Sequence, residues 1–242
     1  MDLAEALHYR RSVRVFDAEK EIDAEQVKYF LELATLAPNS SNMQLWEFYH
    51  LTDPGIMARI SHACLDQSST KTAKQIVVFV TRQDLYRNRA RKVLEIEMEN
   101  IQRSSPTDRQ QSRFKNRKLY YGRLMPFIYS KGFGLWGAFR SLLANGMGAF
   151  RPMVREVSEC DMRVVVHKTC ALAAQTFMIA MAYAGYDTCP LEGFDSSRVK
   201  KILDLPAGAE INMIIPCGIR KGNEGIWGER KRVPFEEVYR RI

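Results

Sequence analysis

The chain has 242 residues, of which 46% are hydrophobic and 26% are charged. This length and composition allow a sizeable core, which excludes disorder of the whole molecule and favours a single domain over residues 1–242. The N-terminus is acidic and lacks the apolar core of a signal peptide, so we expect a cytoplasmic protein. Five cysteines without a C-x-x-C pair and four scattered histidines argue against a disulfide framework and a metal site.

The net charge of +8 fits a nucleic acid, a membrane surface or an anionic small ligand. Much of the excess lies between Arg87 and Arg123, where Glu95, Glu97 and Glu99 are interleaved at helical spacing. Such a pattern is typical of a solvated helix face with some ion pairs, and no helix-turn-helix, RNP or zinc signature accompanies it. We therefore expect no nucleic-acid partner.

The start of the chain predicts two helices. Asp2 and Asp23 are each followed three positions later by Glu or Gln, which is the spacing of a capping box. We therefore expect helices over 3–9 and 24–36, the second broken by the polar segment 38–42.

A strand is expected at 47–51, and a helix after Asp53, because proline at position 54 suits the first helical turn. The β-branched run at 76–80 predicts a buried strand. The charged segment 84–103 has a helical pattern and ends at a turn over 104–108.

The second half of the chain is less regular. Residues 114–129 are compatible with another helix, and five glycines then punctuate an aromatic-rich segment. We interpret 85–163 as an insertion or lid. An apolar helix is expected at 165–184 and a buried strand at 210–219, whereas the tail at 222–242 either wraps a partner subunit or closes a site.

The longest apolar stretch, 170–185, contains Gln175 and Thr176 and is shorter than the roughly 20 residues of a membrane span. It predicts a buried helix and no membrane partner.

Three segments far apart in the sequence point to a function. The first is Arg-Arg-Ser-Val-Arg-Val-Phe at 10–16, and the third is Arg-Lys-Arg-Val-Pro at 230–234. Between them, at 187–195, the apolar helix runs into a proline-glycine turn that carries an acid and suits the presentation of backbone groups to a ligand. Together the three segments resemble the nitroreductase family of FMN-dependent oxidoreductases.

The resemblance implies an α+β fold with a central, mostly antiparallel sheet surrounded by helices. It also implies an intertwined homodimer with FMN at the subunit interface. The implied reaction is ping-pong: NAD(P)H reduces FMN, and a nitroaromatic, quinone or related electron-poor acceptor then reoxidises it. No side chain is expected to be a covalent catalyst, because the flavin carries the redox chemistry.

The alternatives are a reductive dehalogenase or ene-reductase of the same superfamily, and a flavin-binding protein without turnover. The Glu-x-x-x-Tyr pattern of the deiodinase branch is absent here, because no tyrosine follows Glu95, Glu97 or Glu99 at that spacing.

A phosphate monoester needs several converging donors, and arginine supplies a forked, permanently charged set. The residue types alone would favour a solvated helix end for Arg10, Arg11 and Arg14. The resemblance instead implies that the first and third segments hold the FMN phosphate, with these candidates: Arg10, Arg11, Ser12, Arg230 and Arg232.

Arg14 is the candidate for the cation beside the N1 and C2-carbonyl edge of the flavin, where the reduced ring carries negative charge. A surface ion pair is the other interpretation of this residue.

Two loops complete the expected flavin site. Residues Pro38, Asn39, Ser40 and Asn42 resemble the segment that reaches the flavin from the neighbouring subunit, although a helix C-terminal turn would also explain them.

Pro190, Leu191, Glu192 and Gly193 resemble the turn that packs on one flavin face and directs a backbone N–H toward N5. Gln67 is the candidate contact among the polar residues at 66–74.

In the family, the segment before the long core helix shapes the substrate pocket, and 85–163 departs from the best-known members. The identity of the acceptor is therefore left open. Aromatic side chains of this segment either stack on a planar acceptor or belong to the core; they are Tyr120, Tyr121, Phe127, Tyr129, Phe133 and Trp136.

Overall fold

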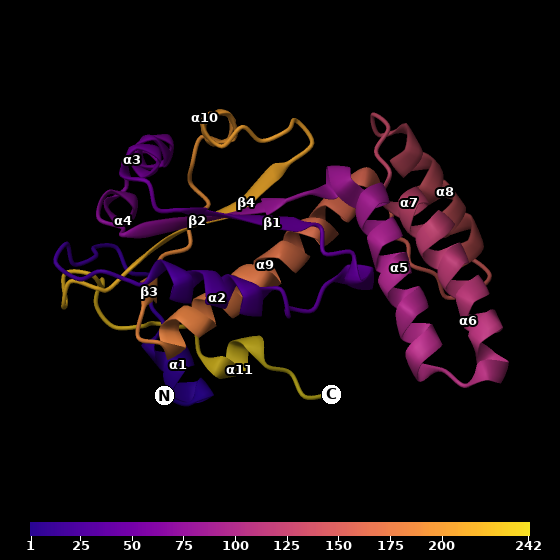
Figure 1. Cartoon of the computed structure of the whole chain (residues 1–242), viewed down its shortest axis with the longest axis horizontal. Coiled ribbons are helices and arrows are strands. Elements are labelled where there is room, and N and C mark those ends of the chain that lie inside the picture. The colour runs from indigo at the N-terminus through magenta and orange to yellow at the C-terminus, as the bar shows by residue number, and fades with distance from the viewer.

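The computed structural model describes residues 1–242 as a four-stranded sheet with helices on both faces and a helical extension at one end (Figure 1). The strands are β1 (Trp46–Leu51), β2 (Gln75–Thr81), β3 (Asp187–Thr188) and β4 (Glu210–Gly218). The helices are α1 (Leu3–Tyr9), α2 (Ala24–Ala34), α3 (Pro54–Ala63), α4 (Ser68–Lys71), α5 (Tyr86–Ser104), α6 (Thr107–Leu119), α7 (Met125–Tyr129), α8 (Leu135–Gly148), α9 (Glu159–Tyr183), α10 (Ser196–Ile202) and α11 (Phe235–Val238). Short turns of other helix types are η1 (Ser40–Asn42), η2 (Gln83–Leu85) and η3 (Tyr120–Leu124).

The sheet has the order β1-β2-β4-β3, and each neighbouring pair is antiparallel. Every residue of the central strand β2 is buried, as its continuous apolar run predicts. Because side chains alternate along a strand, Val77 and Phe79 enter one core while Ile76 and Val78 enter the other. The expected antiparallel α+β fold is confirmed.

Helices α2 and α9 cover one face of the sheet, and α3 and α10 cover the other. The expected capping box of α1 is present, since the Asp2 carboxylate accepts from the Glu5 N–H and the Glu5 carboxylate accepts from the Asp2 N–H. Asp23 caps α2 by accepting from the Glu25 N–H, without the reciprocal bond from Gln26 that a capping box needs. Helix α2 ends at Ala34, two residues earlier than expected.

Helix α9 begins six residues earlier than expected and is 25 residues long. Ser158 and Asp161 form a capping box that starts it. By length and composition alone the whole of α9 could cross a membrane, although the apolar stretch 170–185, on which the prediction was based, is shorter than a span. However, Cys170, Ala173 and Phe177 are fully buried against the sheet, which is the packing of a core helix.

The segment between β2 and α9 is almost entirely helical and includes α5, α6, α7 and α8. The glycine-punctuated stretch, which gave no clear prediction, forms α8. Gly137 permits its close packing, because a Cβ there would lie 2.6 Å from the backbone nitrogen of Glu159. A third apolar cluster, which includes Met43, Tyr121 and Val166, joins this segment to the rest of the molecule.

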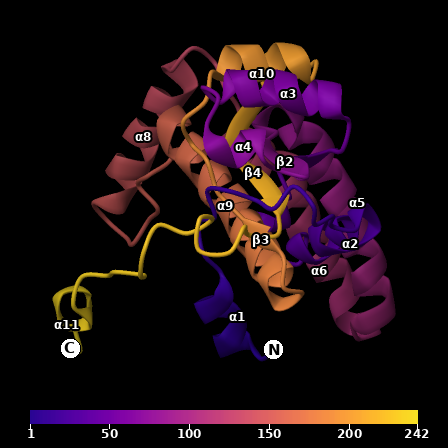
Figure 2. The ribbon, with the colours of Figure 1, turned by 90° about the vertical axis from the view of Figure 1, so that its left-hand side faces the viewer.

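After β4 the C-terminal tail first runs beside the first segment and α1, and its last part, with α11, then extends away from the other elements (Figure 2). No residue of α11 is buried. Its rings of Phe235 and Tyr239 stack on each other at 5.0 Å. The exposed end of the tail therefore leaves both alternatives, wrapping another subunit and closing a site, as predictions.

Candidate functional site

Backbone hydrogen bonds bring the three motif segments together. The Val13 N–H donates to the Thr188 carbonyl at 3.1 Å, so the first segment lies beside the second. The Arg14 N–H donates to the Gly225 carbonyl at 2.8 Å, which joins the first segment to the tail. Residues more than 200 positions apart in the sequence therefore form one surface.

Where the first and third segments meet, they enclose a cavity of about 240 Å³. Its walls include six of the expected residues: Arg10, Arg11, Ser12, Arg14, Arg230 and Arg232. The cavity also contains Glu229, but none of the five arginines forms an ion pair with a carboxylate.

The arginines destabilise one another's charged forms. Burial lowers the pKa of Arg10, and the charges of Arg230 and Arg232 lower it further. Burial and the charges of Arg11 and Arg232 likewise lower the pKa of Arg230. A concave cluster of cations without counter-ions in its own chain is suited to an anion, and the fork of arginine matches phosphate.

Two of these arginines also donate hydrogen bonds to backbone carbonyls. Arg230 donates to the carbonyls of Leu7 at 3.0 Å and His8 at 3.2 Å, and to that of Arg10, so it closes the C-terminus of α1. Arg11 donates to the Gly228 carbonyl at 2.7 Å.

Arg232 donates only to the carbonyl of its neighbour Lys231, which leaves much of its guanidinium free. The Arg14 guanidinium lies 5.2 Å from the ring centroid of Trp227, a stacking partner that the sequence did not suggest.

The turn at 190–193 lies beside Gln67, whose side-chain amide donates to the Gly193 carbonyl at 3.0 Å. Leu191 is buried and pairs with Ile214 of β4, whereas Glu192 and Gly193 are exposed. Their two N–H groups make no backbone hydrogen bond and remain available to a ligand.

A side chain at Gly193 would meet only the Gln67 amide, at an ordinary 3.7 Å. Packing within this chain therefore does not require glycine there, whereas a ligand lying on the backbone would.

A buried ion pair fixes this turn, and the sequence did not single it out. The Asp187 carboxylate is only 2% exposed and accepts from the Arg220 backbone N–H at 2.8 Å and from its Nε at 2.9 Å. The guanidinium of Arg220 also lies over the ring of Tyr9 at 4.2 Å. These contacts join α1, β3 and the end of β4. Because β3 ends just before the turn at 190–193, they also fix the start of that turn. One signal of this ion pair was present in the sequence: Asp187 is the first residue of the motif at 187–195.

The loop expected to reach a partner's flavin has unusual backbone angles. Ser41, Asn42 and Gln44 all have positive φ values, of 54°, 52° and 48°. The Tyr121 hydroxyl donates to the Ser41 carbonyl at 3.0 Å, and the Ser41 and Tyr120 hydroxyls are hydrogen-bonded at 2.8 Å. Such backbone persists only where its surroundings enforce it, and it is concentrated at functional sites.

Within one chain this loop and the arginine cavity are separated. The 10–16 segment precedes α2 and the loop follows it, so they lie toward opposite ends of that helix (Figure 1). Eleven helical residues extend about 16 Å. The structure therefore brings together the first, second and third segments with Gln67, and leaves Pro38, Asn39, Ser40 and Asn42 elsewhere.

Some aromatic side chains of the helical extension belong to the core, and others are exposed where they could stack on a planar acceptor. Tyr121 and Tyr129 are buried in the third core cluster, whereas Phe127, Phe133 and Trp136 are exposed. Tyr121, Phe127 and Trp136 line a cavity of about 580 Å³ between α5, α7 and α8.

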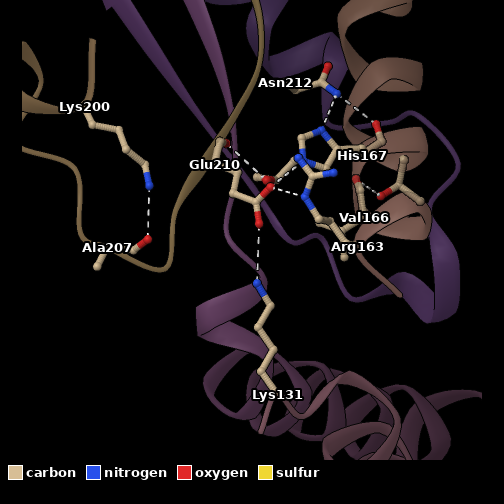
Figure 3. Close-up of polar contacts among 10 residues, drawn as sticks. Lys131, Arg163, Val166, His167, Lys200, Ala207, Glu210 and Asn212 are labelled. Atoms are coloured by element: carbon tan, nitrogen blue, oxygen red, sulfur yellow. Dashed lines mark hydrogen bonds and ion pairs between the residues drawn. The ribbon is translucent and has the colours of Figure 1, made fainter. Parts of the chain in front are cut away.

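A polar cluster fastens the extension to the sheet (Figure 3). Glu210, at the start of β4, accepts from Arg163 at 2.5 Å and pairs with Lys131 at 3.5 Å. It also bonds the His167 ring at 3.2 Å. The hydrogen bond from His167 and the charge of Arg163 lower the pKa of Glu210 to about 2, so this carboxylate stays ionised.

Comparison with known proteins places the chain in a family. A model of the Nitroreductase family matches residues 7–219. Protein DrgA of Synechocystis sp. (strain ATCC 27184 / PCC 6803 / Kazusa) is 25% identical over 98% of this chain and 95% of its own length. YodC of Bacillus subtilis (strain 168), provisionally named an NAD(P)H nitroreductase, is 25% identical over 88% of this chain and 87% of its own.

A crystal structure from Exiguobacterium sibiricum 255-15, solved in complex with FMN, aligns with a TM-score of 0.69 and 18% identity. The alignment covers 100% of this chain and 98% of that one. This chain belongs to the Nitroreductase family.

Proposed function

We propose that the protein is an FMN-dependent oxidoreductase that uses NAD(P)H to reduce nitroaromatics, quinones or related electron-poor acceptors. The observation that carries the proposal is the cavity of five arginines without ion-paired carboxylates, joined by hydrogen bonds to the turn at 190–193. Family membership and the relatives' names support the same activity.

The residues fit FMN. Arg10, Arg232 and the Ser12 hydroxyl hold the phosphate, while Arg11 and Arg230 add charge and fix the backbone around it. Across the turn, Pro190 and Leu191 support the flavin, and Gln67 fixes the Gly193 carbonyl.

When bound, FMN would supply the hydride chemistry that couples NAD(P)H to the acceptor in a ping-pong reaction. The exposed N–H groups of Glu192 and Gly193 would hold and orient the flavin ring on its N5 side. Arg14, oriented by Trp227, would supply positive charge at the N1 edge of the flavin, which would stabilise its reduced form. No side chain is required as a nucleophile. Burial raises the pKa of the Cys189 thiol, which fits an apolar packing residue.

The site is completed by a second subunit. Since the loop with Pro38, Asn39, Ser40 and Asn42 lies away from the arginine cavity of its own chain, we assign it to the flavin of the partner in a homodimer. The unpartnered arm with Phe235 and Tyr239 wraps that partner.

We treat 1–242 as one domain, in which the insertion at 85–163 selects the acceptor through the cavity beside Trp136. We place the enzyme in the cytosol, where its five free cysteines stay reduced.

The test is an absorption spectrum of the purified protein before and after anaerobic addition of NADH or NADPH. We expect a yellow protein that releases FMN on heating, holds one FMN per subunit and is bleached by at least one of the two donors. Subsequent addition of a quinone or nitroaromatic should restore the colour. Recovery of FAD, or of no flavin after reconstitution with FMN, would overturn the cofactor assignment; a yellow protein that neither donor bleaches would indicate binding without turnover.

A further inference from the structure

The cavity of about 580 Å³ between α5, α7 and α8 has aromatic walls. The rings of Phe127 and Trp136 meet there edge to face, with their centroids 6.4 Å apart. Tyr86, the first residue of α5, adds a third ring. The volume lies within the range of small-molecule sites, and such rings offer faces and edges to a planar aromatic molecule.

Three cations and no carboxylate line the same cavity. The cations are Arg87, Arg91 and Lys131. Lys131 pairs with Glu210 at 3.5 Å, so its charge is already balanced within the chain. Arg87 and Arg91 form no ion pair. They lie four residues apart on α5, so their side chains share one face of the helix.

The acids nearest to these two arginines in sequence do not neutralise them. Asp84, one turn before Arg87, is held by Arg82 at 2.9 Å. Glu95, one turn after Arg91, forms no ion pair. The positive charge of the cavity is therefore available to an anionic ligand.

Aromatic stacking orients the first of the two arginines. The Arg87 guanidinium lies 5.5 Å from the ring centroid of Tyr86, and its Nε donates to the Tyr86 hydroxyl at 3.0 Å. The terminal nitrogens of Arg87 remain free to donate to a ligand, and a guanidinium matches the two oxygens of a carboxylate.

A buried arginine lies behind the cavity wall. Arg140 is 2% exposed and donates to the carbonyls of Phe127 at 2.9 Å and Ser130 at 3.0 Å, and both of these residues line the cavity. Its Nη2 is buried without a hydrogen-bond partner. This third arginine adds to the positive potential in the cavity, because charges interact strongly where water is excluded.

The cavity adjoins the loop that we assign to the partner's flavin. Tyr121 lines the cavity, and its hydroxyl donates to the Ser41 carbonyl at 3.0 Å. A molecule in the cavity therefore lies one side chain away from that loop.

We propose that this cavity binds an aromatic electron acceptor that carries a carboxylate or another anionic group. Arg87 and Arg91 bind the anion, and the rings of Phe127 and Trp136 pack on the aromatic part. The inference rests on the function proposed above, in which this cavity receives the acceptor. The two arginines take no part in electron transfer; they determine which acceptors bind.

The same chemistry, a flat ring with an anionic group, occurs in the adenosine 2′-phosphate portion of NADPH. A ping-pong reaction separates the reduction of FMN from its reoxidation, so the donor and the acceptor can be tested apart.

The first test is calorimetric titration of the oxidised, FMN-reconstituted protein with 2-naphthoate and its neutral isostere 2-naphthamide. This measurement does not depend on turnover. We expect naphthoate to bind about tenfold or more tightly, because only the carboxylate forms charge-assisted hydrogen bonds. Arg87→Gln/Arg91→Gln should remove that preference and leave naphthamide binding unchanged, whereas Trp136→Ala should weaken the binding of both probes.

The matched control is Lys92→Gln/Arg103→Gln. It removes the same charge from exposed positions of α5 that do not line the cavity, so the preference for naphthoate should persist. Far-UV circular dichroism and flavin content check that all variants are folded.

The second test compares 4-nitrobenzoate with 4-nitrobenzamide as acceptors. The ratio of their kcat/KM values should fall about tenfold in Arg87→Gln/Arg91→Gln. The rates at which NADH and NADPH reduce the flavin should stay unchanged.

Equal binding of the two naphthalene probes by the parent would contradict the proposal, as would a preference for naphthoate that survives in Arg87→Gln/Arg91→Gln. Slower reduction of that variant by NADPH, but not by NADH, would assign the cavity to the donor and overturn its assignment to the acceptor. Failure of the proposed function is recognised separately, since neither donor would then bleach the parent. In that case selective naphthoate binding would retain the anion site but exclude an acceptor as its ligand.

Discussion

Five arginines line one cavity, but their different contacts indicate different roles. Arg232 donates only to the adjacent carbonyl, so we expect its loss to remove the proposed phosphate contact and little else. Arg230 closes the C-terminus of α1 through three carbonyls, so its loss also removes structure.

We predict that Arg232→Ala weakens FMN binding roughly 10- to 150-fold, since a hydrogen bond to a charged group contributes about 1.5–3 kcal/mol. The melting temperature of the apoprotein should stay unchanged, whereas Arg230→Ala should lower it. Titration of apoprotein with FMN and thermal denaturation measure the two effects, with Lys28→Ala as a surface control. Unchanged affinity in both Arg10→Ala and Arg232→Ala would place the phosphate elsewhere.

Arg14 lies over Trp227, in the same cavity, without an acidic partner. We predict that Arg14→Gln lowers the reduction potential of the bound flavin and slows its reduction by NAD(P)H, because a positive charge beside the reduced ring is lost. Spectroscopic titration against a reference dye and stopped-flow reduction measure both quantities. An unchanged reduction potential and an unchanged rate of flavin reduction in this variant would show that Arg14 is an ordinary surface residue.

At the scale of elements, buried polar contacts hold the turn at 190–193 and the helical extension in place. The Asp187–Arg220 pair joins β3 to the end of β4, with Asp187 almost fully buried. Removal of one partner leaves a charge whose solvation is incomplete.

We predict that Asp187→Ala reduces the free energy of unfolding by about 3 kcal/mol, at the lower end for buried pairs because Arg220 is partly exposed. Urea denaturation measures it. Glu25→Ala, which breaks the exposed pair with Lys28, should cost about 1 kcal/mol or less. Similar losses in the two variants would contradict a special role for the buried pair.

Glu210 gives the fold a pH dependence. Its folded pKa of about 2 lies below the ordinary value of 4.5, so its contribution to stability is complete above about pH 4.5 and is lost as the pH falls toward 2. We predict that the stability difference between the parent and Glu210→Gln is constant above pH 5 and shrinks below 4.5. Denaturation at a series of pH values measures this difference; a difference independent of pH would exclude the ionised cluster as its cause.

At the scale of the whole molecule, our proposal assigns the arginine cavity and the loop at 38–42 to different flavin sites of a dimer. We predict that a chain carrying Arg10→Ala/Arg232→Ala and a chain carrying Asn42→Trp are each inactive as homodimers at low FMN. A heterodimer purified through two tags should regain about half the activity, because one of its two sites is then intact. Failure to regain activity would indicate that each site lies within one chain.

The sequence by itself determined much of the fold. The capping box at Asp2, the N-cap at Asp23 and the β-branched run of β2 predicted their elements because those signals are local. Short elements such as β3 and α10 were missed, since a few residues carry little periodicity. The start of α9 and the whole of α8 were also missed: the first depends on a cap at Ser158, and the second on a close contact that only glycine at 137 allows.

The motif residues were identified because arginine, serine and glycine have distinctive chemistry wherever they occur, and the family prediction made from them is confirmed. Their individual roles remain predictions. Only the tertiary structure decided that Arg10 and Arg232 share a cavity, that Arg230 holds α1 and that Trp227 lies against Arg14, because these contacts join segments over 200 positions apart. The exposure of Leu135 and Leu142 on α8 was decided in the same way: a sequence shows which residues are apolar, but only packing against neighbouring helices determines which of them stay exposed.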